Sequence, residues 1–299
     1  MIPVIDCSKG IAEAGPEIVK AIESVGFVYL KHFGIDTSTV DKVLAVSDEF
    51  WRLDLDVKNK YARPTAYDKG NTGYVAPGVE MLDPTNKAEI REAYNVTPKD
   101  GLFLTFPDEE LPEFRSTVLD FYERCWQVAR EVLHTLAVEL KLPDVDVFEK
   151  THSHAGTGNN ATTLRLLHYP PLPEQIAPGT VRCGEHSDYG TITLLFQDAI
   201  GGLEVKGRDG AFVPANPEPG AVLINAGDLL QRWTDDRILA VKHRVLVPED
   251  RGRWMDERRS LAFFVHPNDD AVVQPLNGAH TYAPITAKQH LLNMFSKTY

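Results

Sequence analysis

Cysteine is scarce in this chain, and the positions of the few cysteines exclude the common cysteine-based sites. The 299 residues contain three cysteines, Cys7, Cys125 and Cys183, and no pair of them has the CxxC spacing of a zinc or redox motif. An odd, sparse set of cysteines is typical of a reducing compartment. We interpret Cys183 as a small strand residue, with an oxidisable thiol as the alternative.

Long apolar runs and excess positive charge are also missing. No run approaches the roughly 20 apolar residues that cross a membrane, and the N-terminus lacks the basic and apolar parts of a secretion signal. The formal net charge is −12, whereas nucleic acids and anionic membranes attract basic surfaces. We therefore expect a cytoplasmic monomer without a nucleic-acid or membrane partner.

The composition is that of an ordinary globular protein, with 43% hydrophobic and 25% charged residues. Capping residues and apolar residues at three- and four-residue steps predict helices over residues 13–24, 36–51, 112–140 and 286–296. Residues 63–90 are rich in Gly and Pro and are predicted to be mostly loop.

From residue 162 onward, short runs of Leu, Val, Ile, Thr and Phe alternate with Gly and Pro turns. This spacing is typical of a β-sandwich or jelly roll, and we expect the helix at 112–140 to cover it. An earlier strand is predicted at 27–30. The predicted strands of the second half span residues 162–169, 190–196, 202–206, 221–225, 238–247 and 258–265.

Two histidines and one aspartate stand out in this strand-like sequence. His186 and Asp188 are two residues apart, and side chains at that spacing in extended backbone lie on one face. His243 lies in a second apolar run. Two histidines and one carboxylate on one face of a metal are typical of non-haem Fe(II) oxygenases. His152 and His154 lack a partner carboxylate and lie in a polar loop, which argues against a second metal site.

An arginine in an apolar strand follows this group. Arg258 and Ser260 would share one face, and a guanidinium with a hydroxyl suits a carboxylate. An arginine among Leu, Ala and Phe needs an anion to offset its desolvation, and a dicarboxylate cosubstrate would supply one. Arg253 in the preceding hairpin is a competing candidate, but only Arg258 is followed by x-Ser and an apolar strand.

The order His186-x-Asp188, His243, Arg258-x-Ser260 resembles the isopenicillin N synthase-like family of iron and 2-oxoglutarate dependent oxygenases. The resemblance covers nearly the whole chain. One departure is a hairpin between His243 and Arg258 that is longer than in plant members of the family. The other segments that carry the resemblance are residues 2–6, 26–30, 201–205, 225–228 and 231–234.

The resemblance implies an α+β fold with a double-stranded β-helix (jelly-roll) core and flanking α-helices. Residues 1–115 would form the N-terminal region, and residues 116–299 the jelly-roll core with its backing helix, together as one compact unit. The implied activity is oxidation, chiefly hydroxylation, of a small molecule, with release of succinate and CO2. Fe(II) would be the metal, and 2-oxoglutarate and O2 the cosubstrates.

The resemblance also implies roles for single residues. The implied metal ligands are His186, Asp188 and His243, and the residues that would hold 2-oxoglutarate are Arg258, Ser260 and Tyr169. Two alternatives stay open at this point. One is an Fe(II) oxidase of the same fold that does not use 2-oxoglutarate, and the other is a non-catalytic metal-binding jelly roll.

Five residues are candidate contacts for the substrate: Tyr74, Arg91, Arg182, Tyr189 and Phe264. By strand parity, Phe264 lies on the face of the predicted cosubstrate residues and Arg182 on that of the first histidine, where it could pair with an anionic substrate group. Tyr189 follows the predicted metal aspartate. In the resembling family the counterpart of the Gly- and Pro-rich loop helps to cover the substrate, which adds Tyr74 and Arg91. A packed tyrosine and surface arginines are the alternative interpretations.

Overall fold

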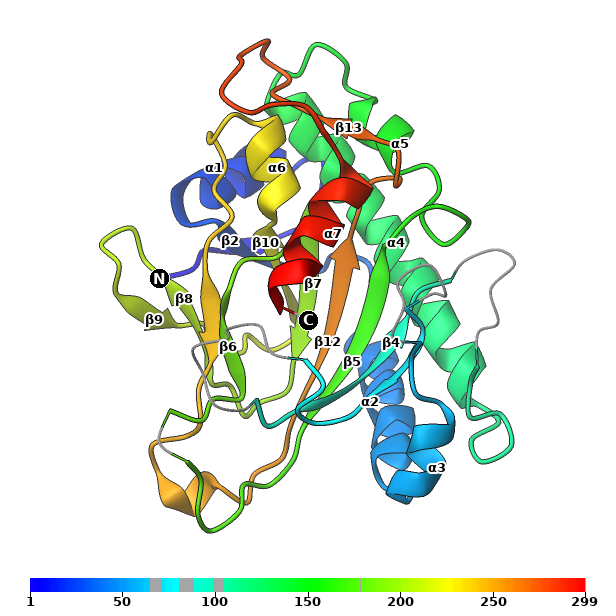
Figure 1. The fold of residues 1–299 in the computed structure, drawn as a ribbon. Coiled ribbons are helices and arrows are strands. Elements are labelled where there is room, and N and C mark those ends of the chain that lie inside the picture. Colours follow the sequence, from blue (N-terminus) through cyan, green and yellow to red (C-terminus); the bar gives the residue numbers. More distant parts are fainter. Residues whose placement is uncertain (65–70, 81–88, 99–104, 178, 299) are drawn as a thin grey trace.

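Two facing β-sheets form the centre of the molecule, and helices cover the outer face of the larger one (Figure 1). The computed structural model describes residues 1–299 except 65–70, 81–88, 99–104, 178 and 299. The strands are β1 (Val4–Asp6), β2 (Phe27–Lys31), β3 (Gly73–Val75), β4 (Glu92–Val96), β5 (Thr163–Tyr169), β6 (Cys183–His186), β7 (Ile192–Gln197), β8 (Leu203–Lys206), β9 (Phe212–Pro214), β10 (Ala221–Ala226), β11 (His243–Val245), β12 (Arg258–Val265), β13 (Val272–Val273) and β14 (Ile285–Thr286).

The larger sheet has the strand order β1-β2-β10-β7-β12-β5-β4-β3, and the smaller has the order β6-β11-β8-β9. All neighbours in these two sheets are antiparallel except β1 and β2, which are parallel. Side chains from both sheets, such as Val205, Val245, Leu167 and Ala262, form one buried apolar cluster between them. The expected jelly-roll core is therefore present, and β1 to β4 of the N-terminal region extend its larger sheet.

The long helix α4 packs behind the larger sheet (Figure 1). Its Phe121 and Tyr122 rings contact Phe196 of β7 and Phe263 of β12, with centroids 5.1 and 5.0 Å apart. No helix in the described part of the chain is long and apolar enough to span a membrane. The helices are α1 (Gly15–Val25), α2 (Thr37–Trp51), α3 (Leu55–Lys60), α4 (Phe114–Glu139), α5 (Val147–Thr151), α6 (Asp228–Trp233) and α7 (Ala287–Thr298), with a short 3-10 turn, η2, at Arg251–Arg253.

Strand β12 separates the helix-side core from the space between the sheets. Leu261, Phe263 and Val265 belong to the core under α4. Arg258, Ser260, Ala262 and Phe264 alternate with them and line a cavity on the opposite face. Because side chains alternate along a strand, the Arg-x-Ser pattern places a guanidinium and a hydroxyl together inside that cavity.

Some predicted elements differ from the structure. Only His243–Val245 of the run predicted at 238–247 is a strand, because Asp235 and Asp236 adopt left-handed φ values of 52° and 63° and turn the chain after α6. The predicted boundary between residues 115 and 116 falls inside α4. Strand β4, Glu92–Val96, was not predicted. It is buried on both faces, but its charged and amide side chains do not give the apolar pattern of a buried strand.

Candidate functional site

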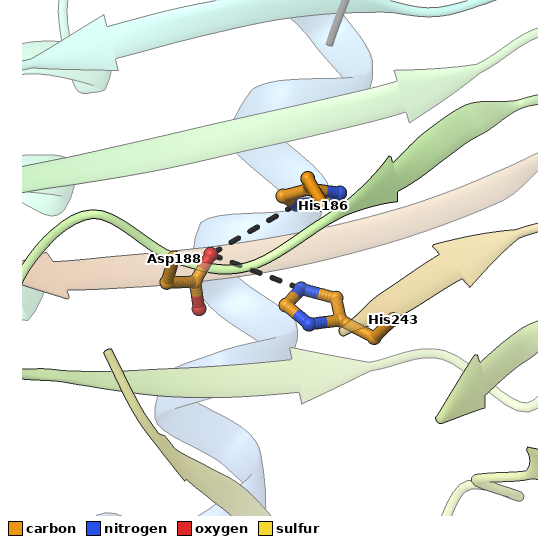
Figure 2. A group of neighbouring side chains, drawn as sticks. All are labelled: His186, Asp188 and His243. Atoms are coloured by element: carbon orange, nitrogen blue, oxygen red, sulfur yellow. Dashed lines mark ion pairs between the residues drawn. The ribbon is translucent and has the colours of Figure 1, made fainter. Parts of the chain in front are cut away.

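His186, Asp188 and His243 converge between the two sheets (Figure 2). His186 ends β6, Asp188 lies just beyond it, and His243 starts β11 directly opposite His186 in the antiparallel pair. The Nε2 atoms of His186 and His243 lie 3.9 and 3.8 Å from Oδ1 of Asp188. The paired part of β6 ends at His186, so Asp188 reaches the group from the segment just beyond the strand.

Backbone contacts fix the orientation of both imidazoles. Nδ1 of His186 lies 2.8 Å from the carbonyl oxygen of Gly184, and Nδ1 of His243 lies 3.2 Å from that of Val241. A carbonyl only accepts hydrogen bonds, so each Nδ1 carries the proton and each Nε2 presents a lone pair toward Asp188. Such contacts on the far nitrogen are typical of metal-binding histidines.

Asp188 is held in the same way. Its Oδ2 accepts hydrogen bonds from Thr193 Oγ1 at 2.6 Å and Asn225 Nδ2 at 2.7 Å, which leaves Oδ1 facing the two Nε2 atoms. The backbone nitrogen of Asp228 also donates to the carbonyl of Asp188 at 2.8 Å. Asn225 lies near the end of β10, and the chain after it can come this close because it contains Gly227, where a Cβ would lie 2.3 Å from the carbonyl oxygen of Gly190.

The protonation states of the three groups suit a cation. Burial, followed by the charge of His186, lowers the pKa of His243 to about 4, and burial also lowers the pKa of His186. Burial alone would raise the pKa of Asp188, but the histidines and its two hydrogen bonds lower it below the usual value. Near neutral pH the site therefore offers two neutral imidazoles and one carboxylate, a donor set that fits Fe(II).

A buried cation lies farther along the same cavity. Arg258 is 1% exposed, and its guanidinium donates to Gly201 O at 2.7 Å, Ser260 Oγ at 3.2 Å and Gln197 Oε1 at 3.0 Å. Its Cζ lies 4.7 Å from the ring centre of Tyr169, its partner across the sheet. Arg258 has no ion pair with any described residue. Since a buried charge needs a counter-ion, this end of the cavity fits an anionic ligand.

Arg253, the competing candidate for the anion site, lies elsewhere. Its side chain is 46% exposed in η2, where it pairs with Asp256 at 3.3 Å and donates to the carbonyl of Ile200 at 2.9 Å. It is not among the described residues that line the cavity. The geometry favours Arg258.

The cavity has a volume of about 150 Å³ and joins the histidine–aspartate group to Arg258. Of the five candidate substrate contacts, Tyr189, Phe264 and Arg91 line it. Two placements need correction, since neither Tyr74 nor Arg182 is among the described lining residues. Tyr74 is buried and donates to Glu92 at 2.6 Å, and Arg182 donates to the carbonyl of Asp256 at 2.9 Å.

Several polar residues of the cavity were missed in the sequence. They form its wall on β4 and β5, just before β3 and just after β4: Asn71, Asn95, Thr97, Thr163 and Arg165. For β5 the sequence did contain a signal: Thr163 and Arg165 are an even number of residues from Tyr169, so they lie on the same face of the strand. For Asn71 and Asn95 there was none, since their neighbours in the cavity come from distant sequence.

Two side chains near the site have structural roles in this arrangement. Burial raises the pKa of Cys183 to about 11, so its thiol is neutral and unreactive near neutral pH. His152 is fully buried, and its two ring nitrogens contact Phe148 O and Thr191 Oγ1, each at 2.8 Å. His152 therefore belongs to the packing around the site.

Comparison with known proteins agrees with this geometry. The profile of the 2OG-Fe(II) oxygenase superfamily matches residues 160–267, and that of the non-haem dioxygenase in morphine synthesis N-terminal region matches residues 2–113. A 2-oxoglutarate-Fe(II) type oxidoreductase of Metarhizium rileyi is 35% identical over 278 residues, covering 87% of this chain and 77% of that protein. A proline hydroxylase of Petromyces alliaceus is 35% identical over 269 residues, covering 86% and 82%.

A solved structure is similar over almost the full length. It is that of a full-length Neurospora crassa protein in complex with α-ketoglutarate, with a TM-score of 0.86 and 33% identity, and the match covers 99% of this chain and 96% of that one. The chain belongs to the 2OG-Fe(II) oxygenase superfamily. The predictions of a jelly-roll fold and of an iron- and 2-oxoglutarate-dependent dioxygenase are confirmed.

Proposed function

We propose that His186, Asp188 and His243 hold the iron of this dioxygenase and that Arg258, Ser260 and Tyr169 hold the far carboxylate of 2-oxoglutarate. One observation carries the assignment: three donor atoms lie within 4.8 Å of one another while the outer atom of each group is held by a separate partner. A buried guanidinium without an ion pair to the described residues lies in the same cavity.

When bound, iron and 2-oxoglutarate together supply the oxidising chemistry, in which O2 is consumed, 2-oxoglutarate becomes succinate and CO2, and one oxygen atom enters a C–H bond of the substrate. The residues of the chain bind and orient the reactants. Arg258 and Ser260 would fix the far end of the cosubstrate. The apolar side chains Leu167, Leu203 and Val245 exclude water around it, which strengthens the charge interactions inside the site.

The wall opposite the iron ligands indicates the kind of substrate. Oδ1 of Asn95 and Nε of Arg165 are buried and lack a hydrogen-bond partner among the described residues. These residues lie opposite each other on β4 and β5, and both line the cavity. A neutral small molecule that carries an N–H and a C=O group would satisfy both atoms, with Phe264 and Tyr189 beside it. The similar Neurospora crassa protein has been crystallised with thymine, which carries both groups.

We also propose that the protein acts as a monomer in a reducing compartment such as the cytoplasm. The buried, unpaired state of Cys7, Cys125 and Cys183 supports the compartment. A single species of about 33 kDa in size-exclusion chromatography with light scattering would support the monomer, given the chain mass of 33.3 kDa, and a dimer mass would contradict it.

A coupled turnover assay tests the proposed function. The purified protein is loaded with Fe(II) and given 2-oxoglutarate and a panel of small molecules that includes thymine and proline. We expect one succinate per oxidised substrate, and none from a folded Asp188→Ala variant. Substrate oxidation without succinate would favour the oxidase alternative. The absence of both 2-oxoglutarate turnover and oxidation of any substrate in the panel by the iron-loaded protein would favour a non-catalytic metal-binding protein.

A further inference from the structure

Arg182 is a second buried cation at the end of the cavity where Arg258 lies. It is 1% exposed, and the carbonyl that it binds belongs to Asp256, two residues before Arg258 in the chain. Arg182 directly precedes β6, and its guanidinium reaches across to the backbone just before β12, where Arg258 begins the strand. Unlike the other arginines near the cavity, Arg91 and Arg165, it has no ion pair with a carboxylate in the described ranges.

The hydrogen bonds of Arg182 are too few for its burial. Its guanidinium makes one bond, from Nη2 to the carbonyl of Asp256 at 2.9 Å, while its buried Nε has no partner in the described part of the chain. Burial, and next the positive charge of Arg258, lower the pKa of Arg182; smaller opposing effects come from Tyr169, Asp198 and Asp256. Because Arg182 binds the backbone two residues before Arg258, two buried like charges share this region, and such charges need an anion.

Resting on the proposed function, we propose that Arg182 is a positioning and specificity-determining residue for the cosubstrate. Its charge adds to that of Arg258, so the two cations together favour a 2-oxo acid with a charged far carboxylate over one with a neutral end. Arg182 does not line the cavity, so it acts through space rather than by touching the ligand. This role differs from the contact with the substrate that strand parity predicted.

Calorimetric titration of the Mn(II)-loaded protein separates this role from a structural one. The ligands are 2-oxoglutarate and 2-oxopentanoate, which has the same chain without the second carboxylate. Arg182→Gln keeps a donor for the Asp256 carbonyl but loses the charge, and Arg182→Lys keeps the charge. Arg253→Gln is the matched control, because Arg253 is exposed, contacts Asp256 and also binds a backbone carbonyl.

We expect Arg182→Gln to bind 2-oxoglutarate about tenfold more weakly and 2-oxopentanoate within about twofold of the wild type. Arg182→Lys should recover most of the loss, and Arg253→Gln should match the wild type. In turnover, Arg182→Gln should raise the KM for 2-oxoglutarate with little change in kcat.

The inference would be overturned if Arg182→Gln weakened the binding of both ligands equally, or if Arg182→Gln and Arg182→Lys had equal effects. A purely structural arginine predicts both results. If Arg182→Gln is unfolded, Arg182→Lys decides: a folded Lys variant that has lost the preference for 2-oxoglutarate over 2-oxopentanoate contradicts the role of charge. A wild type that binds no 2-oxoglutarate would contradict the proposed function itself. Wild-type binding by Arg182→Gln, with weak binding by Arg258→Gln, would overturn this inference alone.

Discussion

Single hydrogen bonds to the outer oxygen of Asp188 decide where its inner oxygen points. Asn225 and Thr193 both bind Oδ2, and Gly227, two residues after Asn225, allows the chain to pass close to Gly190 and Asp188. We expect Asn225→Ala to weaken Fe(II) binding by about 10- to 100-fold, because partners of metal ligands commonly contribute that much. Metal titration measures this, with Asn277→Ala at an exposed turn as the control. Wild-type affinity in the Asn225 variant would show that Asp188 needs no such support.

The two candidate arginines of the anion site make a second prediction for single residues. Arg258→Gln should raise the KM for 2-oxoglutarate well over tenfold, because a buried charge pair that loses one partner costs about 2–5 kcal/mol. Arg253→Gln should leave the KM within about fivefold, since an exposed pair contributes about 0–1 kcal/mol. Succinate release at varied 2-oxoglutarate and saturating iron is the measurement. Exchanged behaviour of the two variants would make Arg253 the anchor.

At the scale of elements, a buried network ties α3 to β4 and β5. Glu92 of β4 accepts hydrogen bonds from Lys58 of α3 at 2.9 Å and Tyr74 of β3 at 2.6 Å, and it contacts Nδ1 of His168 on β5 at 2.8 Å. Burial alone would raise the pKa of Glu92, but the bonds from His168, Tyr74 and Lys58 lower it below the usual value. The carboxylate form therefore stabilises the fold.

We expect Glu92→Gln to lower the free energy of unfolding at pH 7 by about 3 kcal/mol, because Lys58 would lose its buried partner. A lowered folded-state pKa means that this stabilisation is present above the unfolded-state pKa of about 4.3 and is lost as the pH falls through the folded value. The difference from the wild type should therefore shrink in acid. Urea unfolding at several pH values measures it. Glu218→Gln, which removes the half-exposed pair with Lys31, is the control, and an equal loss in both variants would contradict the network.

The same elements show how far the sequence could predict the site. In the sequence, the spacing of His186 and Asp188 and the apolar runs around His243 and Arg258 single out these four residues, and the structure brings them to one cavity. Asn95 could not, because its role depends on Arg165 across the sheet, 70 residues later in the chain. Residues that stand out within their own segment could be predicted, whereas a residue whose role depends on a partner from distant sequence could not.

Residues 238–247 illustrate the opposite error. Their Val, Ile and Leu content favours a strand, yet only His243–Val245 pairs with β6 and β8. The preceding turn at Asp235 and Asp236 and a bond from Ala240 N to Gln231 Oε1 at 2.7 Å hold the rest in irregular backbone. Tertiary contacts overrode the strand propensity there.

At the scale of the whole molecule, the metal group exists only when the smaller sheet has formed. His186 and His243 lie 57 residues apart in the sequence and face each other as partners of β6 and β11. A ligand that binds only the folded state stabilises that state. Fe(II) should therefore raise the unfolding temperature of the protein, and 2-oxoglutarate should raise it further only when the metal is present. A shift with 2-oxoglutarate alone would show that the arginine end of the cavity binds the cosubstrate without the metal.

Fe(II) titration by calorimetry under anaerobic conditions, on the wild type and on His243→Ala, tests the central assignment most directly. His243 contributes its imidazole ring to the site. Removing the ring should leave the fold intact, which circular dichroism can check. We expect one Fe(II) site in the wild type and no saturable binding in His243→Ala over the same concentrations. Wild-type Fe(II) affinity in a folded His243→Ala variant would contradict the assignment of His186, Asp188 and His243 as the metal centre.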